Sequence, residues 1–144
     1  MKPDGAVAAI DPGRNKCGLV CSDPGQQQLA LACIVSPEAC LDRLRMWQAK
    51  GTVSTVVLGD GTSSRHWQRQ LEQLGLPVVL VDEWGTTLAA RALYWELWPP
   101  RGWRRLLPSG LRLPPRDLDD LAAQILLERW LKHKLPRGPG TLGP

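Results

Sequence analysis

The sequence is poor in the features that build membrane spans, secretion signals and zinc sites. No apolar run approaches the length needed to cross a bilayer, and no apolar signal region follows the charge near the N-terminus. The four cysteines contain no Cys-x-x-Cys pair, and the two histidines, His66 and His133, lie far apart in the chain. We therefore expect a soluble, cytoplasmic protein without a structural zinc site, whose thiols behave as small hydrophobes.

Acidic residues are scarce in the last third of the chain. Residues 1–100 carry nine Lys and Arg against ten Asp and Glu, whereas residues 101–144 carry nine against four. This basic third is typical of a protein with a polyanionic partner such as nucleic acid, although a merely solvated surface has the same composition. The 144 residues predict one domain, over residues 1–135, followed by a disordered Pro/Gly-rich tail over residues 136–144.

The local patterns predict an α/β chain. Short apolar runs bounded by turn residues predict strands, and apolar residues at helical spacing predict helices. The first three strands, joined by short turns, would form an antiparallel meander, and the later ones would follow helices, which together favour one mixed sheet flanked by helices. The expected strands cover residues 6–11, 17–22, 28–35, 53–58 and 77–81, and the expected helices cover 37–50, 64–74, 86–98 and 117–134.

The first predicted strand ends on a single carboxylate, Asp11, before a Pro-Gly turn. A carboxylate at the end of a central strand is costly unless something pairs with it, and a metal ion is one such partner. An Asx-turn before Pro12 explains the residue equally well. Asp60 and the Asp82-Glu83 pair also follow predicted strands directly, so parallel neighbours would bring these acids to one edge of the sheet.

Three segments in order resemble the YqgF/RuvX family of RNase H-like nucleases, which are related to RuvC resolvases. They run from Ile10 to Leu19, from Val81 to Thr87 and from Leu118 to Leu127, and the match in order and spacing extends from about Gly5 to Leu131. The resemblance implies an RNase H-like fold with a five-stranded mixed sheet of order 3-2-1-4-5. The chain departs from the family at Trp84, where Arg is usual, and at Gly85, which replaces an apolar residue.

The resemblance also implies an activity and a set of site residues. It implies a metal-dependent endonuclease, a hydrolase of phosphodiester bonds in structured nucleic acid, acting in pre-16S rRNA processing for ribosome biogenesis or in Holliday-junction resolution. It selects Asp11, Glu83 and Asp119 as catalytic and metal-binding residues, with Mg²⁺ or Mn²⁺ as the cation, and these hard ions prefer oxygen ligands. RNA and branched DNA both stay open as partners, and a homodimer is among the possible assemblies.

Trp84 motivates an alternative: an RNase H-fold module that binds nucleic acid with weak or no catalysis. Asp60 matches no family acid and is kept as a reserve ligand.

Helical periodicity separates the acids near residue 119. At about 100° per residue, Asp119 falls near the edge of the apolar arc of the last helix, and Asp120 falls on roughly the opposite side. We therefore expect Asp119 to face the sheet, with Asp117 as the N-cap and Asp120 completing the charge at the helix start.

The loop from Pro99 to Pro115 combines arginines with tryptophan and contains no acid. Arginine and tryptophan suit phosphate contacts and base stacking, although the tryptophans would serve equally to pack the loop onto the body. Because the loop must return to the start of the last helix, we expect it to bring its arginines beside Asp119. The predicted nucleic-acid-binding residues are Arg14, Lys16, Arg101, Arg104, Arg105 and Arg112.

Overall fold

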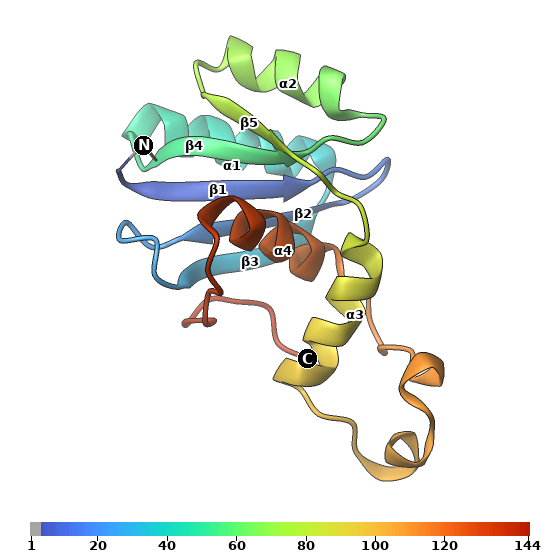
Figure 1. Cartoon of the computed structure of the whole chain (residues 1–144). Helices are drawn as coiled ribbons and strands as arrows, with labels where there is room; N and C mark the ends of the chain where they lie inside the picture. Colours follow the sequence, from blue (N-terminus) through green and yellow to red (C-terminus); the bar gives the residue numbers. More distant parts are fainter. Residues whose placement is uncertain (1–3) are drawn as a thin grey trace.

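A five-stranded mixed sheet forms the centre of the computed structural model, which describes residues 4–144 (Figure 1). The strand order is β3-β2-β1-β4-β5, with β1 antiparallel to β2, β2 antiparallel to β3, and β4 parallel to both β1 and β5. This order confirms the predicted five-stranded mixed sheet of order 3-2-1-4-5, with β1 in the middle. The strands are β1 (Ala6–Asp11), β2 (Cys17–Ser22), β3 (Leu29–Val35), β4 (Val53–Gly59) and β5 (Val78–Val81).

Among residues 4–144, four α-helices flank the sheet, close to where the sequence predicts them. The first begins after Ser36, whose hydroxyl accepts a hydrogen bond from the Ala39 amide at 3.1 Å, and ends at Gly51 in the left-handed conformation with φ of 67°. Over residues 4–144 no helix is long and apolar enough to span a membrane. The helices are α1 (Pro37–Lys50), α2 (Ser64–Gln73), α3 (Thr86–Leu97) and α4 (Asp119–Leu131).

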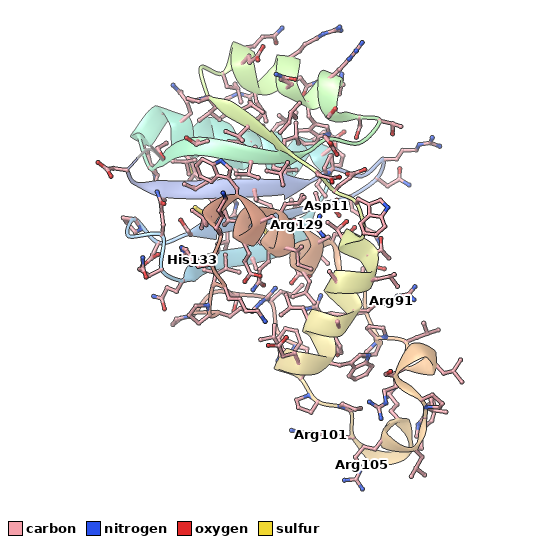
Figure 2. The ribbon with its side chains drawn as sticks, viewed as in Figure 1. Asp11, Arg91, Arg101, Arg105, Arg129 and His133 are labelled. Carbon is pink, nitrogen blue, oxygen red and sulfur yellow. The ribbon has the colours of Figure 1, made fainter. Side chains whose placement is uncertain are left out.

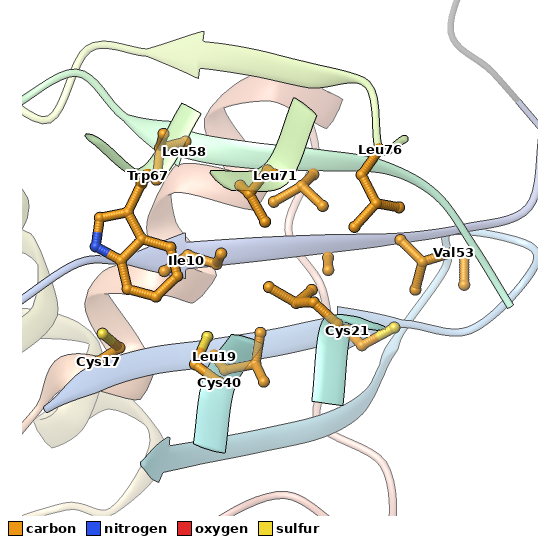
Figure 3. Close-up of a cluster of buried hydrophobic side chains, with 14 residues drawn as sticks. Ile10, Cys17, Leu19, Cys21, Cys40, Val53, Leu58, Trp67, Leu71 and Leu76 are labelled. Atoms are coloured by element: carbon orange, nitrogen blue, oxygen red, sulfur yellow. The ribbon is translucent and has the colours of Figure 1, made fainter. Parts of the chain in front are cut away.

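The central strand β1 is buried on both faces. Ala8 and Ile10 pack with residues of α1 and α2 on one face (Figure 3), whereas Val7 and Ala9 pack against α4 on the other. Strand side chains alternate between faces, so the two apolar halves of β1 require two helical layers. The cysteines are free thiols, and Cys17, Cys21 and Cys40 lie in the first of these clusters as small hydrophobes, as predicted.

Helix α4 differs from its prediction in bounds and in environment. It begins at Asp119, with Leu118 rather than Asp117 at the cap position, and it ends before Lys132, whose φ is 64°. The side chain of Asp120, which helical periodicity places roughly opposite the apolar arc, is fully buried. It accepts hydrogen bonds from Arg116 Nη1 at 2.8 Å and from Arg137 Nη2 at 3.0 Å. Asp120 is therefore buried away from the apolar arc, because Arg116, four residues before it, and Arg137, 17 residues after it, cover that side of the helix.

The Pro/Gly-rich tail, expected to be disordered, lies along the outer strand β3. Leu29 and Arg137 form one bridge and Ala32 and Thr141 another. The Leu142 amide donates to the Ala32 carbonyl at 3.1 Å. The tail thereby covers the hydrogen-bonding edge of β3, a place where native sheets usually need protection against pairing with other chains.

Residues 99–115 form an arm that extends away from the sheet beyond the end of α3 (Figure 1). Two short 3₁₀ helices, η1 (Gly102–Leu106) and η2 (Ser109–Leu111), give the arm its shape. The Arg112 guanidinium joins them by donating to the carbonyls of Arg104 and Arg105, both at 3.0 Å. Trp95 Nε1 on α3 donates to the Arg112 carbonyl at 2.9 Å, which fixes the arm to its helix.

Candidate functional site

The site is built around the end of the central strand, where Asp11 is the last residue of β1. Its partner across the antiparallel pair is Gly18 on β2. By alternation Asp11 shares its face with Val7 and Ala9, the face that α4 covers. The strand therefore presents the Asp11 carboxylate on the side of the sheet where α4 begins.

Asp119 arrives at the same place because β2 and α4 touch at Gly18. A Cβ atom on Gly18 would overlap the carbonyl oxygen of Asp119, so only glycine allows this approach. Gly18 is thus flanked by Asp11 across the strand pair and by Asp119 on the helix. Helical periodicity and the family resemblance both select Asp119, but no sequence pattern specifies this contact with Gly18.

Glu83 reaches the site from the other side, over the end of β4. Its amide donates to Asp60 Oδ1 at 3.2 Å, and its carbonyl accepts from the Thr86 amide at 3.1 Å, which closes the turn before α3. The Glu83 carboxylate lies against Gly59 and Gly61, where a Cβ on Gly59 would be 2.9 Å from Oε2. Asp60 therefore supports the backbone of Glu83.

The electrostatics place the three acids within range of one another. Burial raises the pKa of Asp11 from 3.8 to about 7, and the charges of Asp119 and then Glu83 add to the shift. Burial also raises the pKa of Asp119, and the Lys16 ammonium partly opposes that increase. Three neighbouring carboxylates in a half-buried place repel one another when ionised. A bound cation would offset that repulsion, so the site favours binding one.

The geometry suits a metal held by few protein ligands. In residues 4–144 no three His, Cys, Asp or Glu side chains are arranged to hold one ion between them. The predicted convergence on one shared ion is therefore not seen. Mg²⁺ binds through one or two carboxylates, substrate phosphates and waters rather than through an all-protein cage. Asp11 with one flanking carboxylate fits that mode, and all the donors are oxygens.

A cleft of about 430 Å³ opens beside Asp11 and Asp119. Its walls also carry Lys16 from the β1–β2 turn and Arg91 from α3, so cations face the acids across a space large enough for a phosphodiester. Lys16 is partly committed, because its ammonium pairs with Asp117, and this hydrogen bond raises the pKa of Lys16. Arg91 is missing from the sequence-based predictions because its isolated position on a helix carries no local signal.

The other predicted nucleic-acid contacts lie away from the cleft. Arg101 and Arg105 are on the arm, far from Asp11 (Figure 2), so the expected return of the loop toward Asp119 is wrong for these residues. The Arg112 guanidinium is engaged with carbonyls of the arm itself. Arg14 is exposed in the β1–β2 turn and lines a separate hollow with Thr62 and Ser63. Of the six predicted residues, only Lys16 lines the cleft.

Comparison with known proteins gives a partial match. No protein-family model matches the chain. Curated relatives from Coxiella burnetii, each named "Putative pre-16S rRNA nuclease", align over 73 residues, which is 50% of this chain and 43% of the relative. Identity is 34% for strains Dugway 5J108-111 and RSA 493 / Nine Mile phase I, and 33% for strain CbuK_Q154. The chain thus matches less than half the length of these relatives.

A solved structure described as "Thermus thermophilus RuvC structure" covers 88% of this chain and 94% of its own, with 16% identity and a TM-score of 0.41. The family resemblance rests on the curated relatives, which are up to 34% identical to this chain over the aligned residues. The resemblance to the YqgF/RuvX nucleases is therefore confirmed by curated relatives over half of the chain.

Proposed function

We propose that this protein is a metal-dependent nuclease that hydrolyses phosphodiester bonds in structured nucleic acid. One observation carries the proposal: at the end of the central strand, Asp11 has Asp119 on one side, across Gly18, and Glu83 on the other, over Gly59. The names of the curated relatives favour the precursor of 16S rRNA as the substrate. Branched DNA is the other substrate to test, and the cytoplasm is where such RNA processing would take place.

Each group at the site has a proposed part. Asp11, together with either Asp119 or Glu83, would hold Mg²⁺ or Mn²⁺, and the ion would help to activate water and stabilise the leaving oxygen when bound. Lys16 and Arg91 would contact the phosphates on either side of the cleaved bond from the walls of the cleft. Asp60 would hold the backbone of Glu83 in place through its 3.2 Å hydrogen bond.

The decisive experiment is a cleavage assay on labelled precursor 16S rRNA and on four-way junction DNA. Each substrate is incubated with Mg²⁺, with Mn²⁺ or with EDTA, and the products are separated on a denaturing gel. We expect cleavage that needs the metal and is lost in Asp11→Asn. Cleavage by Asp11→Asn at the wild-type rate would contradict the assignment of the site.

Gly61 offers an independent test of Glu83. A Cβ on Gly61 would overlap Glu83 Oε1, and the carboxylate is the movable end of a flexible side chain. Gly61→Ala should therefore displace the carboxylate and reduce cleavage with little change in the melting temperature. Gly110→Ala is the matched control, since a Cβ there meets nothing within 4 Å. Equal cleavage by the two variants would remove Glu83 from the site.

A binding module with weak or no catalysis is the second candidate. Two observations favour it: Trp84 stands where the family usually has Arg, and in the described part of the chain no three acids are arranged around one ion. This candidate predicts metal-independent affinity for nucleic acid and no cleavage of either substrate. Binding of either substrate without cleavage in Mg²⁺ or Mn²⁺ would favour this candidate, whereas metal-dependent cleavage would exclude it.

A further inference from the structure

Trp84 presents a nearly bare indole to solvent. It is 83% exposed, more than Trp103 on the arm at 63%, whereas Trp67 in the core is 4% exposed. Single exposed apolar residues are common, but an indole left in water forgoes a large area of apolar burial. Its position in the fold distinguishes it from an ordinary surface residue.

The backbone under Trp84 is held by several hydrogen bonds. The Trp84 amide donates to Asp82 Oδ1 at 2.9 Å. Arg129 Nη1 on α4 donates to the Asp82 carbonyl at 2.7 Å. Gly85 then takes a left-handed conformation with φ of 74°, and α3 begins at Thr86. The turn is therefore fixed while its aromatic ring stays free, an arrangement that lowers the cost of binding because less has to be ordered.

The same turn belongs to the candidate site. Trp84 directly follows Glu83, whose charge reaches Asp11. One helical turn further along, Leu88 is 69% exposed, and Thr87 and Arg91 on the same helix line the cleft. A nucleic-acid strand whose phosphate lies in the cleft would thus place a neighbouring nucleotide beside the indole.

We propose, on the basis of the nuclease function proposed above, that Trp84 stacks on an unpaired nucleobase next to the phosphate bound in the cleft. Every base offers a π-face to an aromatic ring, but a base inside a duplex already has both faces covered by its neighbours. The substrate class is therefore nucleic acid with a single-stranded or unpaired nucleotide at the site. A cation would read only the phosphate backbone at this position, whereas an indole distinguishes unpaired from paired bases.

The test measures binding without cleavage. A fluorescein-labelled single-stranded RNA short enough to fill only the cleft and not reach the arm, and the same strand annealed to its complement, are titrated with protein in EDTA and followed by anisotropy. The variants are Trp84→Ala, Trp84→Phe and, as a matched exposed tryptophan outside the site, Trp103→Ala. We expect Trp84→Ala to weaken binding of the single strand by about 5- to 100-fold. Trp84→Phe should retain most of the affinity, and Trp103→Ala should retain it fully.

The duplex serves as the internal control, and its affinity should not change in Trp84→Ala. Wild-type affinity of Trp84→Ala for the single strand, or an equal loss for strand and duplex, would overturn the proposal. So would a wild-type protein that binds no single strand, which would favour a protein partner for the indole. Cleavage that persists with unaltered strand binding in Trp84→Ala refutes the stacking role alone. Trp84-dependent binding without any cleavage refutes the nuclease function alone.

Discussion

Gly18 and Asp119 approach each other so closely that a single methyl group cannot fit between strand β2 and the start of helix α4. A Cβ on Gly18 would overlap the carbonyl oxygen and carbon of Asp119 and lie 2.9 Å from the amide nitrogen of Asp120. All three are backbone atoms, so no side-chain rotation relieves the overlap. Because Gly18 is also the cross-strand partner of Asp11, one glycine keeps both acids side by side.

Replacing this glycine should damage stability and activity together. Gly18→Ala forces α4 away from β2, and overpacking of this kind costs about 1–3 kcal/mol of unfolding free energy. Asp119 moves with the helix, so we expect cleavage to fall further than the loss of folded protein explains. Urea denaturation and cleavage rates of Gly18→Ala and Gly110→Ala give the comparison. Wild-type cleavage by Gly18→Ala would show that Asp119 need not be adjacent to Asp11.

The raised pKa of Asp11 predicts how stability depends on pH in metal-free buffer. Folded Asp11 binds its proton up to about pH 7, whereas the unfolded side chain releases it near 3.8. Between these values the folded state holds more protons, so the contribution of Asp11 to stability falls as pH rises, by about 1.4 kcal/mol per unit of pKa shift. Asp11→Asn lacks this loss, and its melting temperature should exceed that of the wild type at pH 8 but not at pH 4.

Thermal unfolding in EDTA, repeated with Mg²⁺ at pH 8, checks that prediction. The metal should raise the melting temperature of the wild type, because its positive charge neutralises the ionised Asp11 carboxylate. It should leave the melting temperature of Asp11→Asn unchanged, because that variant has no such carboxylate. Parallel pH profiles for the two proteins would show that Asp11 is not the crowded acid that the structure indicates.

Asp120 gives a prediction about the fold rather than the reaction. Its carboxylate is fully buried between Arg116 and Arg137, and the Arg137 side chain is itself only 8% exposed. Asp120→Ala leaves both guanidinium groups without their carboxylate. We expect it to reduce the free energy of unfolding by roughly 3–5 kcal/mol, as is typical when one partner of a buried ion pair is removed. Asp117→Ala is the matched control, since its pair with Lys16 is exposed to solvent and contributes little to stability. Equal costs in urea denaturation would refute the buried network.

Local signals account for the parts of the fold that the sequence predicts well. The alternating faces of β1, the Ser36 cap and the Gly51 stop each depend on residues within a few positions of one another. Asp11 stands out for the same reason, as a lone acid directly after a buried strand. The choice of Glu83 needed the family resemblance. Asp119 is selected both by the resemblance and by its position near the edge of the apolar arc, although acids at a helix start also have an ordinary structural explanation.

The remaining errors concern contacts between distant parts of the chain. Helical periodicity places Asp120 opposite the sheet, but it contains nothing about Arg137, 17 residues away, which covers that side. Likewise, the direction of the arm is fixed by the hydrogen bond from Trp95 to Arg112, also 17 residues apart. Charge alone could not show that the Arg112 guanidinium binds carbonyls of its own arm rather than phosphate.

The position of the arm leads to a prediction about salt dependence that separates two groups of cations. Lys16 and Arg91 line the cleft, whereas the arm arginines lie far from Asp11 (Figure 2). Each phosphate contact with a single strand contributes about 0.7 to the slope of log affinity against log salt. Replacing Arg101, Arg104 and Arg105 by Ala should therefore reduce the slope by about 2 for a strand long enough to reach the arm. The arm variant should leave the slope unchanged for an oligonucleotide that fills only the cleft. For that short oligonucleotide, replacing Lys16 and Arg91 by Ala should reduce the slope by about 1.4. Anisotropy titrations over a range of salt concentrations, with both lengths and with the wild type and both variants, give the six slopes. An unchanged slope for the long strand in the arm variant would show that those arginines are only a solvated surface.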